Sequence, residues 1–240
     1  MRLARAQTAD GIVTGEYDNG VIHADGTTYS INPDGATLLP PADPSALYCI
    51  GRNYAATLDQ MDYDVPDEPD FFIKPPTALL APGEPLSYPG FTDELTYAGE
   101  LAAVIDKQAH NITPKAVPEV VRGYTILNDV DALDQPGRTA RKAFDGAAPL
   151  GPWIETDIDP YGLSMHTEIS GERRQEATTD QMLFDPYETV AFLSERFTFR
   201  PGDVIAFGSP ENPGLIEPGD TVSITYEGIG TLEHDIVASE

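Results

Sequence analysis

Apolar and polar residues alternate over residues 11–39 in short runs that are separated by turn sequences. The turns are DNG at 18–20, DG at 25–26 and PDG at 33–35, and all three favour tight hairpins. Strands joined by such short turns lie side by side in sequence order. The start of the chain is therefore predicted to be a small β-meander.

A proline-rich connector, PPADPSA at 40–46, separates this meander from the rest of the chain. Further strands are expected at 101–105, 123–130, 164–170, 203–208, 221–226 and 229–237, and helices at 55–62, at 114–121 and from Asp185 onward. The pattern predicts an α+β fold that is predominantly β. We expect a small N-terminal β domain at 1–45 and a larger domain at 46–240.

One carboxylate interrupts the apolar segment LTYAGELAAVID at 95–106. Side chains alternate between the two faces of a strand, so Glu100 shares a face with Ala98 and Ala102. An ionised carboxylate on an apolar face loses solvation unless a cation, a metal ion or a set of donors compensates it. Either Glu100 lies on an edge strand and reaches water, or it belongs to a functional site.

Asp129 is the best candidate partner for Glu100, because it follows directly on the apolar strand GYTILN and can emerge at the end of a sheet. Converging carboxylates without sulfur or imidazole are typical of a site for Mg²⁺, Mn²⁺ or Ca²⁺. Lys74 and Lys142 lie in apolar, proline-stiffened segments, where an ammonium would suit a substrate carboxylate or an enolate oxygen. The alternative is that each lysine only neutralises nearby acids.

The charge of the chain is strongly negative, with 40 aspartates and glutamates against 14 lysines and arginines and a net charge of −26. The acidic residues are spread along the whole sequence, which predicts a carboxylate-covered surface that repels nucleic acids and anionic membranes. Such a surface suits a protein from concentrated salt, a halophile, because salt screens the self-repulsion. An ordinary acidic cytosolic protein is the alternative.

The single cysteine, Cys49, excludes an internal disulfide and a CxxC metal site. The N-terminal residues lack the apolar core of a signal peptide, and no apolar run approaches the length of a membrane span. The sequence therefore predicts a soluble, cytoplasmic protein with no nucleic-acid partner and no membrane partner.

A series of short motifs, taken in order, resembles the fumarylacetoacetate hydrolase superfamily, which includes acylpyruvases, oxaloacetate decarboxylases, homoprotocatechuate-pathway isomerases and sugar-acid dehydratases. The motifs are CIGRNY (49–54), FFIKPP (71–76), GEL (99–101), GYTILNDV (123–130), KAFDGAAPLGPW (142–153), GDVIAFGSP (202–210) and PGDTVSITYEGIGTL (218–232). The resemblance covers residues 47–237, which is nearly the whole chain.

The resemblance implies the mixed, largely β core of that family and a homodimer. It also implies Mg²⁺ or Mn²⁺ held by three carboxylates, and a small 2-oxo or β-dicarbonyl acid that chelates the ion. Glu100 and Asp129 fall on metal-ligand positions, and Lys74 and Lys142 are the candidate catalytic residues. The candidate substrate-binding residues are Arg52, Asn53, Tyr54 and Ser209.

The chain departs from the family's motifs at positions that carry chemistry. The metal motif of the family is Glu-x-Glu-Leu, and Ala98 replaces its first glutamate. Many hydrolytic members activate water with a histidine and, three residues later, a glutamate; Thr57 and Gln60 stand at those positions, and neither is a general base near neutral pH. We expect weakened Mg²⁺ binding unless a water, Asp131 or Glu94 supplies the missing ligand.

The leading hypothesis is an enzyme that acts on a small 2-oxo or β-dicarbonyl acid with a divalent metal ion, as a lyase, isomerase, tautomerase or decarboxylase. Such chemistry needs a place for enolate charge but no activated water. One alternative is an acylpyruvate-type C–C hydrolase that uses another base, such as Asp59 or Asp131. The other is a non-catalytic family member that only binds a small acid.

Thermal stability should depend steeply on salt. Forty acidic side chains repel one another in dilute buffer, and the screening length falls from ~10 Å at 0.1 M salt to ~3 Å at 1 M. We expect the melting temperature, measured by scanning calorimetry, to rise steeply between low and molar KCl. An unchanged melting temperature over this range would contradict adaptation to salt.

Overall fold

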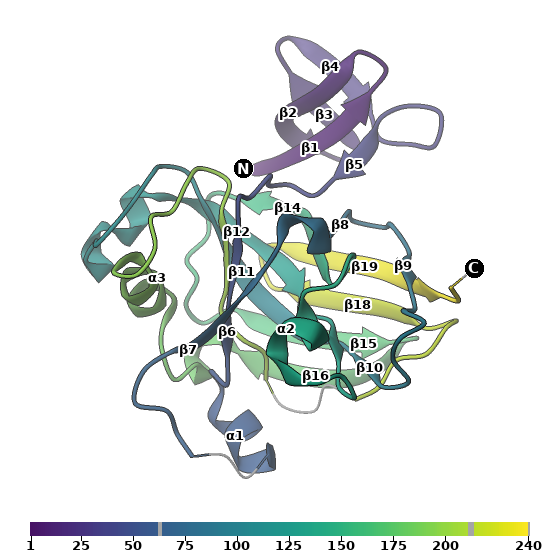
Figure 1. Cartoon of the computed structure of the whole chain (residues 1–240). Helices are drawn as coiled ribbons and strands as arrows, with labels where there is room; N and C mark the ends of the chain where they lie inside the picture. Colours follow the sequence, from purple (N-terminus) through teal and green to yellow (C-terminus); the bar gives the residue numbers. More distant parts are fainter. Residues whose placement is uncertain (62–63, 211–213, 240) are drawn as a thin grey trace.

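Two β-sheets packed face to face form the body of the molecule, and a small meander projects from one end (Figure 1). The computed structural model describes residues 1–61, 64–210 and 214–239. The strands of the larger sheet run in the order β4-β3-β2-β1-β14-β12-β11-β17-β6-β7, and those of the smaller sheet in the order β16-β15-β18-β19-β9. The expected α+β fold with a predominant β content is confirmed.

The N-terminal meander consists of β1 (Arg2–Thr8), β2 (Gly11–Asp18), β3 (Val21–Ala24), β4 (Thr27–Ser30) and β5 (Thr37–Leu39). Two of its predicted hairpin turns are confirmed, since Asn19-Gly20 and Asp25-Gly26 both have positive φ angles at both residues, as a type I′ turn requires. Small apolar side chains of the meander form a separate core, against which Trp153 of the main body packs.

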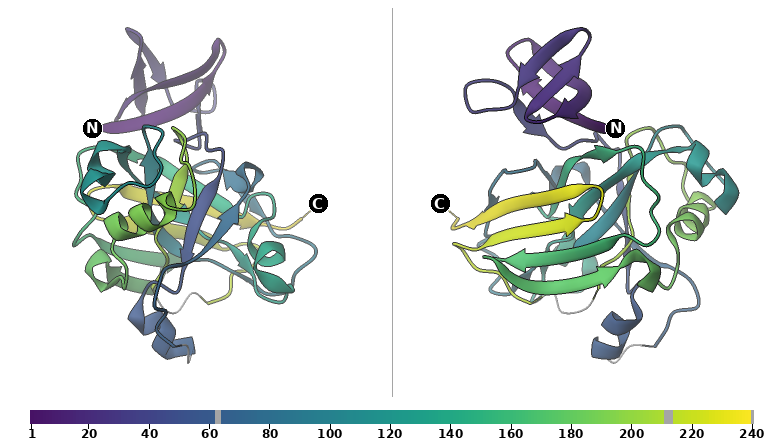
Figure 2. Two further views of the ribbon diagram at one scale, coloured as in Figure 1. Left: turned by 60° about the vertical axis from the view of Figure 1, so that its left-hand side comes forward. Right: turned by 180° about the vertical axis from the view of Figure 1, so that it is seen from behind.

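Besides the short β8, the main body contributes six strands to the large sheet: β6 (Leu47–Gly51), β7 (Asp70–Lys74), β11 (Gly99–Ile105), β12 (Val121–Asn128), β14 (Ala148–Glu155) and β17 (Val204–Ala206). The smaller sheet contains β9 (Leu86–Ser87), β15 (Ser164–Ile169), β16 (Glu172–Thr178), β18 (Thr221–Tyr226) and β19 (Gly230–Val237), and Figure 2 shows it from behind. Short pairs are made by β8 (Leu79–Leu80) with β14 and by β10 (Leu95–Thr96) with β13 (Asp131–Ala132).

Helices are short and lie outside the sheets. They are α1 (Ala55–Met61), α2 (Gly137–Lys142) and α3 (Pro186–Ser194), with 3₁₀ turns η1 (Pro76–Ala78), η2 (Pro114–Glu119) and η3 (Thr179–Gln181). Asp185 caps α3 as predicted, because its carboxylate accepts hydrogen bonds from the N–H groups of Tyr187 and Glu188. None of the described helices is long and apolar enough to cross a membrane.

The six strands expected beyond the meander are present, with ends shifted by at most two residues. The expected helix at 114–121 is a 3₁₀ turn, because Pro118 within it has no N–H for an α-helical hydrogen bond. Several elements were not expected from the sequence, such as β6 and β7. Others are β14, whose two prolines hide a strand pattern, the highly charged β16, and the short helix α2.

β11 is a central strand, paired with β12 on one side and with β17 on the other, and all seven of its residues are buried. The face of β11 that carries Gly99 packs closely on the smaller sheet. A Cβ atom added to Gly99 would lie only 2.7 Å from Thr167 Oγ1. Glu100 points to the opposite face and is 2% exposed. The alternative of an edge-strand glutamate in water is therefore wrong.

A buried histidine links the two sheets. The side-chain oxygen of Asn128 accepts a hydrogen bond from Ala98 N–H at 2.9 Å, so its amide nitrogen faces His234 Nε2 at 3.1 Å. His234 Nε2 must then be an acceptor, which requires the neutral imidazole with its proton on Nδ1. Burial favours the same form and lowers the pKa of His234 to about 4.

His234 should make the fold sensitive to mild acid. Because its pKa is about 4 in the folded chain and ordinarily about 6.5, the unfolded chain takes up a proton first as the pH falls. The stability that neutral His234 contributes is complete above pH 6.5 and is lost as the pH falls toward 4, by roughly 3 kcal/mol. His234→Gln should flatten this part of the curve of unfolding free energy against pH, measured by denaturant titration in constant salt. An identical pH dependence in the variant would contradict the assignment.

Candidate active site

Two buried carboxylates lie on one face of the large sheet. Gly99 is paired with Asn128, and the N–H of Asp129 donates to the carbonyl of Ala98 at 2.9 Å. Asp129 therefore lies opposite Ala98, on the same face as Glu100, and is 3% exposed. Ala98 itself is only partly buried, although both of its neighbours are buried, so the face opens toward solvent at this point.

Lys74 lies beneath Asp129 and is completely buried. Its ammonium group is 2.8 Å from Asp129 Oδ1 and donates hydrogen bonds to backbone carbonyls at 3.2, 2.6 and 2.9 Å. These carbonyls belong to Val130, Lys142 and Ala147. An ammonium group has three protons, so these four contacts use all of its donor capacity. Lys74 fixes the segment around Asp129 and has no donor left for a substrate.

Lys142 approaches Asp129 from the other side. Its ammonium group contacts Asp129 Oδ2 directly and lies 3.0 Å from Asp131 Oδ2. Arg141 holds Asp131 through two hydrogen bonds of 2.7 Å each, so the carboxylate of Asp131 is fully engaged. Of the three donors of Lys142, two are used by these carboxylates and the third is available.

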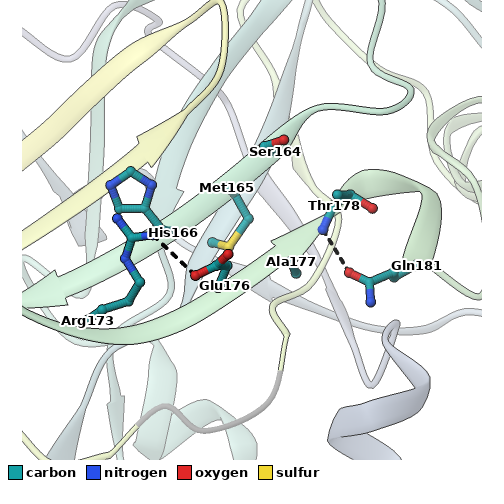
Figure 3. Close-up of a pocket in the computed structure, with 8 residues that line it drawn as sticks. All are labelled: Ser164, Met165, His166, Arg173, Glu176, Ala177, Thr178 and Gln181. Atoms are coloured by element: carbon teal, nitrogen blue, oxygen red, sulfur yellow. Dashed lines mark hydrogen bonds and ion pairs between the residues drawn. The ribbon is translucent and has the colours of Figure 1, made fainter.

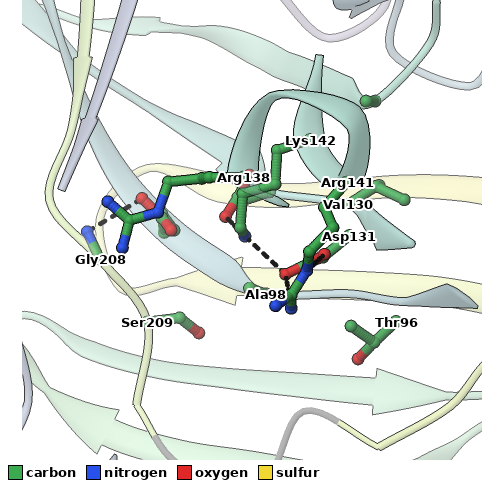
Figure 4. A network of polar contacts seen from close by, with 12 residues as sticks. Thr96, Ala98, Val130, Asp131, Arg138, Arg141, Lys142, Gly208 and Ser209 are labelled. Atoms are coloured by element: carbon green, nitrogen blue, oxygen red, sulfur yellow. Dashed lines mark hydrogen bonds and ion pairs between the residues drawn. The ribbon is translucent and has the colours of Figure 1, made fainter. Parts of the chain in front are cut away.

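Helix α2 supplies three cations from one face (Figure 4). Arg138, Arg141 and Lys142 are three and four residues apart, which places their side chains next to one another. Arg138 reaches in the opposite direction from Arg141 and binds both oxygens of Asp70, at 2.8 and 2.7 Å. Arg138 is thereby matched with Asp70, whereas Arg141 and Lys142 are matched with the neighbouring pair Asp129 and Asp131.

The charges in this cluster shift one another's pKa values. Burial raises the pKa of Glu100 to about 8, with Asp129 adding to the effect and the Gly208 N–H and the two lysines opposing it. Burial also acts against ionised Asp129, but Lys142 and Lys74 outweigh it and lower the pKa of Asp129. The same pairing raises the pKa of Lys142 despite its burial. Near neutral pH the site therefore contains the ammonium group of Lys142, ionised Asp129 and a Glu100 that can exchange its proton.

The loop after β17 closes the site on the side of Glu100. Gly208 N–H donates to Glu100 Oε2 at 2.9 Å. Gln175, from β16, accepts from Gly99 N–H at 3.2 Å and donates to Ser209 Oγ at 2.9 Å. Ser209 is thus held beside Glu100 by a glutamine from the second sheet.

Thr57, at the position of the base in hydrolytic members, contacts the scaffold. Its hydroxyl donates a hydrogen bond to the carbonyl of Ser209 at 3.1 Å, so it anchors the same loop. The side chain of Gln60, the other residue at a hydrolytic position, lies outside the described part of the chain.

The four candidate substrate-binding residues have different environments. The side-chain amide of Asn53 accepts a hydrogen bond from Phe184 N–H at 2.9 Å. It donates to the carbonyl of Phe184 at 3.0 Å and to that of Phe207 at 2.8 Å. Tyr54 is buried, with Tyr226 beside it. Both therefore contact the scaffold in this structure. Arg52 and Ser209, in contrast, are partly exposed at the site, and binding by all four stays a prediction.

The residues present do not match the family's three-carboxylate metal site. Ala98 offers no ligand, both oxygens of Asp129 contact lysine ammonium groups, and Asp131 is held by Arg141. Among the described residues there is no group of three or more His, Cys, Asp or Glu side chains placed to hold a metal ion. A divalent ion would have to displace an ammonium group from Asp129, so Glu100 and Asp129 alone form a poor site for it.

A surface hollow of about 350 Å³ lies elsewhere, on β15 and β16 (Figure 3). Its charged residues Arg173 and Glu176 pair with each other at 3.2 Å. None of its lining residues belongs to the cluster around Lys142. We therefore place the functional site at the charged cluster.

Sequence reasoning missed Arg138, Asp70 and Gln175. Asp70 and Arg138 are 68 residues apart, and Gln175 is on an unexpected strand, so no local pattern connects them. One signal was present, because Arg138, Arg141 and Lys142 have helical spacing, but a six-residue helix leaves too short a pattern to recognise.

Divalent binding should be weak and should improve when the missing carboxylate is restored. Ala98→Glu adds a third oxygen ligand beside Glu100 and another negative charge, so we expect it to tighten Mg²⁺ or Mn²⁺ binding at least tenfold. Isothermal titration calorimetry checks this, with Glu100→Gln as the variant that should abolish binding. Tight binding by the natural chain, unaffected by Glu100→Gln, would show that the ion binds elsewhere.

The chain matches known proteins over most of its length. A family model described as fumarylacetoacetate (FAA) hydrolase, C-terminal, matches residues 46–237. A bifunctional isomerase/decarboxylase of 4-hydroxyphenylacetate degradation from Salmonella dublin is 34% identical over 209 residues, which are 84% of this chain and 49% of that protein.

Solved structures show the same similarity. 5-Carboxymethyl-2-hydroxymuconate delta-isomerase from Mycobacterium smegmatis superimposes with a TM-score of 0.91 at 38% identity, over 100% of both chains. Maleylpyruvate hydrolase from Sphingobium sp. SYK-6, solved with manganese(II) and pyruvate, has a TM-score of 0.85 at 27% identity, again over 100% of both chains. The chain belongs to the fumarylacetoacetate hydrolase family.

Proposed function

We propose that this protein is an enzyme that enolises a small 2-oxo or β-dicarbonyl acid, as an isomerase, tautomerase or decarboxylase. The observation that carries the proposal is the arrangement of Lys142, Asp129 and Glu100 on one partly open face of the sheet. Relatives named as isomerases and an isomerase/decarboxylase support this class of reaction.

Lys142 is the residue proposed to contact the substrate. Its remaining donor can bind the 2-oxo oxygen or the carboxylate of the substrate, and its positive charge stabilises the enolate oxygen that develops during the reaction. Asp129 and Asp131 hold the ammonium group in place, so little reorganisation is needed when negative charge appears. Lys74 acts indirectly, because it keeps Asp129 ionised and fixed.

Glu100 is the residue proposed to move the proton. Gly208 binds one of its oxygens, and its pKa of about 8 lies close to neutral, where an acid–base group is most effective. In its ionised form, the carboxylate of Glu100 can take a proton from the carbon next to the 2-oxo group, and the resulting carboxylic acid can return that proton elsewhere on the enolate. In an isomerase or tautomerase this transfer moves a double bond. In a decarboxylase the bond to the leaving carboxylate breaks, CO₂ departs, and the protonated form of Glu100 supplies the hydrogen that replaces it.

Hydrolysis of a C–C bond is the second candidate, favoured by the relatives that are named as hydrolases. It needs a base that deprotonates water, and Thr57 instead holds the loop at Ser209. Asp131 is engaged by Arg141 and Lys142, which makes it a poor substitute. A non-catalytic role in binding a small acid is the third candidate. Metal assistance of the kind suggested by the manganese-containing relatives stays a prediction, and the steps above use only the chain's own groups.

Exchange of carbon-bound hydrogen tests enolisation directly. We expect the natural protein to accelerate exchange of the methyl hydrogens of pyruvate in D₂O, followed by proton NMR, and Lys142→Met to reduce the rate about 10²-fold, as loss of one preorganised charge donor typically does. Lys107→Met is the matched control, because Lys107 is an exposed lysine whose ammonium group donates, among the described contacts, to the carbonyl of Glu119 only.

A hydrolysis assay with acylpyruvate separates enolisation from hydrolysis. Acylpyruvate should be hydrolysed slowly or not at all by the natural chain, and a triple variant, Ala98→Glu with Thr57→His and Gln60→Glu, should gain hydrolysis, since general-base catalysis contributes ~10²–10⁴ in rate. Brisk hydrolysis by the natural chain would contradict the proposal. Absence of exchange with every 2-oxo acid, together with measurable binding, would favour the non-catalytic role.

A further inference from the structure

We propose that a hollow between the N-terminal meander and the main body binds a small carboxylate that carries a short apolar chain. The two parts of the molecule that meet there are seen in Figure 1. This junction hollow has a volume of about 240 Å³, below the ~300–1,000 Å³ of sites for drug-sized ligands, so its ligand is small. It shares no lining residue with the charged cluster around Lys142. A ligand here therefore does not depend on the proposed function.

The junction hollow lies at the ends of two strands whose other ends carry the candidate active site. Val104, near the end of β11, and Arg122, near the start of β12, both line it. Val104 is four residues from Glu100 along β11, which corresponds to ~13 Å at ~3.3 Å per residue. A small ligand in the hollow therefore does not reach Glu100.

Two arginines line the junction hollow, and each has N–H groups left for a ligand. Arg122 donates from Nε and Nη2 to Asp106 Oδ1, at 2.9 and 2.8 Å. Arg5 donates from Nη1 to the carbonyls of Pro40 and Ala42, at 3.1 and 2.9 Å. Among the contacts of the described residues, Nη1 of Arg122 and Nε of Arg5 have no partner. A guanidinium group has five N–H donors, so both arginines can still bind a carboxylate.

The proline-rich connector forms one side of the junction hollow and is fastened from two directions. Asp203 is fully buried and accepts hydrogen bonds from the N–H and the hydroxyl of Ser45, at 2.8 and 2.7 Å, and from Ala46 N–H at 3.2 Å. Arg5 binds the connector from the meander through its two carbonyl contacts. The guanidinium group of Arg5 is thus positioned before a ligand arrives, so little conformational freedom is lost on binding.

One carboxylate also lines the junction hollow and limits the charge of its ligand. Asp43 Oδ2 lies 3.4 Å from Arg5 Nη2, and the side chain of Asp43 is 84% exposed. A pair this exposed contributes little and is screened by salt, so an incoming carboxylate can replace it. With two arginines and one aspartate, the lining carries a net charge of +1, which matches a monoanion.

Most of the remaining lining is apolar, which distinguishes an organic acid from an inorganic anion. It is formed mainly by Pro41, Val104, Ile105, Ile154 and Pro201. An apolar chain that covers these residues is removed from water, which favours binding, whereas phosphate or sulfate would leave this part of the lining unused. The arginines at the same time bind the carboxylate group.

Calorimetric titration of the whole chain with three probes tests the site. 3-Methylbutanoate has both the carboxylate and the apolar chain, 3-methylbutanamide has the same shape without the charge, and acetate lacks the chain. We expect 3-methylbutanoate to bind at least tenfold more tightly than either of the others at one fixed KCl concentration. Equal binding of the amide would exclude recognition by arginine, and equal binding of acetate would exclude recognition by the apolar lining. Either result, or no binding of 3-methylbutanoate, would overturn the inference.

Two variants with matched controls locate the ligand. Arg122→Gln should weaken 3-methylbutanoate at least tenfold, whereas Arg174→Gln, which removes an arginine on β16 that is likewise 43% exposed, should leave its affinity unchanged. Thr14 is exposed and lies opposite Arg5 in the pairing of β1 with β2. Thr14→Glu adds an internal carboxylate that competes with the ligand and should weaken it by a similar factor, while Thr14→Gln should keep the affinity within about threefold. Unchanged affinity in both Arg122→Gln and Thr14→Glu would show that the acid binds elsewhere and would refute the site.

Discussion

The burial of Asp129 between two ammonium groups is the constraint on which the rest of the site depends. An ionised carboxylate that is 3% exposed is stable only with close counter-charges. Lys74 provides one charge and at the same time fastens three carbonyls of the 130–147 segment, which holds α2 in place. Lys142 provides the other. Removing either lysine would leave a buried charge without enough compensation, so the same contacts that prepare the chemistry also hold the segment together.

Other parts of the fold keep Asp129 and Lys142 accessible from one side. The smaller sheet closes the Gly99 face of β11, Gln175 crosses from it to fix Ser209, and Asn53 and Thr57 fasten the same loop from the direction of α1. The open side is lined by the cations of α2. A site that is rigid on the sheet side and charged on the helix side suits a small anionic ligand better than a large one.

The part of this arrangement that follows from local pattern could be predicted from sequence. Alternation in β11 placed Glu100 on the face of Ala98, and the end of an apolar strand marked Asp129. The lysines stood out because the chain has so few of them. What could not be predicted depends on long-range contacts, such as Asp70 with Arg138, or on elements too short or too polar to give a periodic signal, such as α2 and β16. Equally, the sequence could not show that Asn53 and Tyr54 contact the scaffold, since the residues beside them come from distant segments.

The tight packing at Gly99 determines how this site can change during evolution. Any side chain there would collide with Thr167, Ile224 and Met165 of the second sheet, at 2.7 to 3.0 Å for the first carbon alone. Its neighbour Ala98 faces the open side and has no such restriction. Along this strand, substitutions at 98 can therefore alter the chemistry without disturbing the sheet packing, whereas those at 99 are selected against before they can affect the chemistry. A family with this architecture can lose or regain a ligand by a single substitution while the fold stays the same.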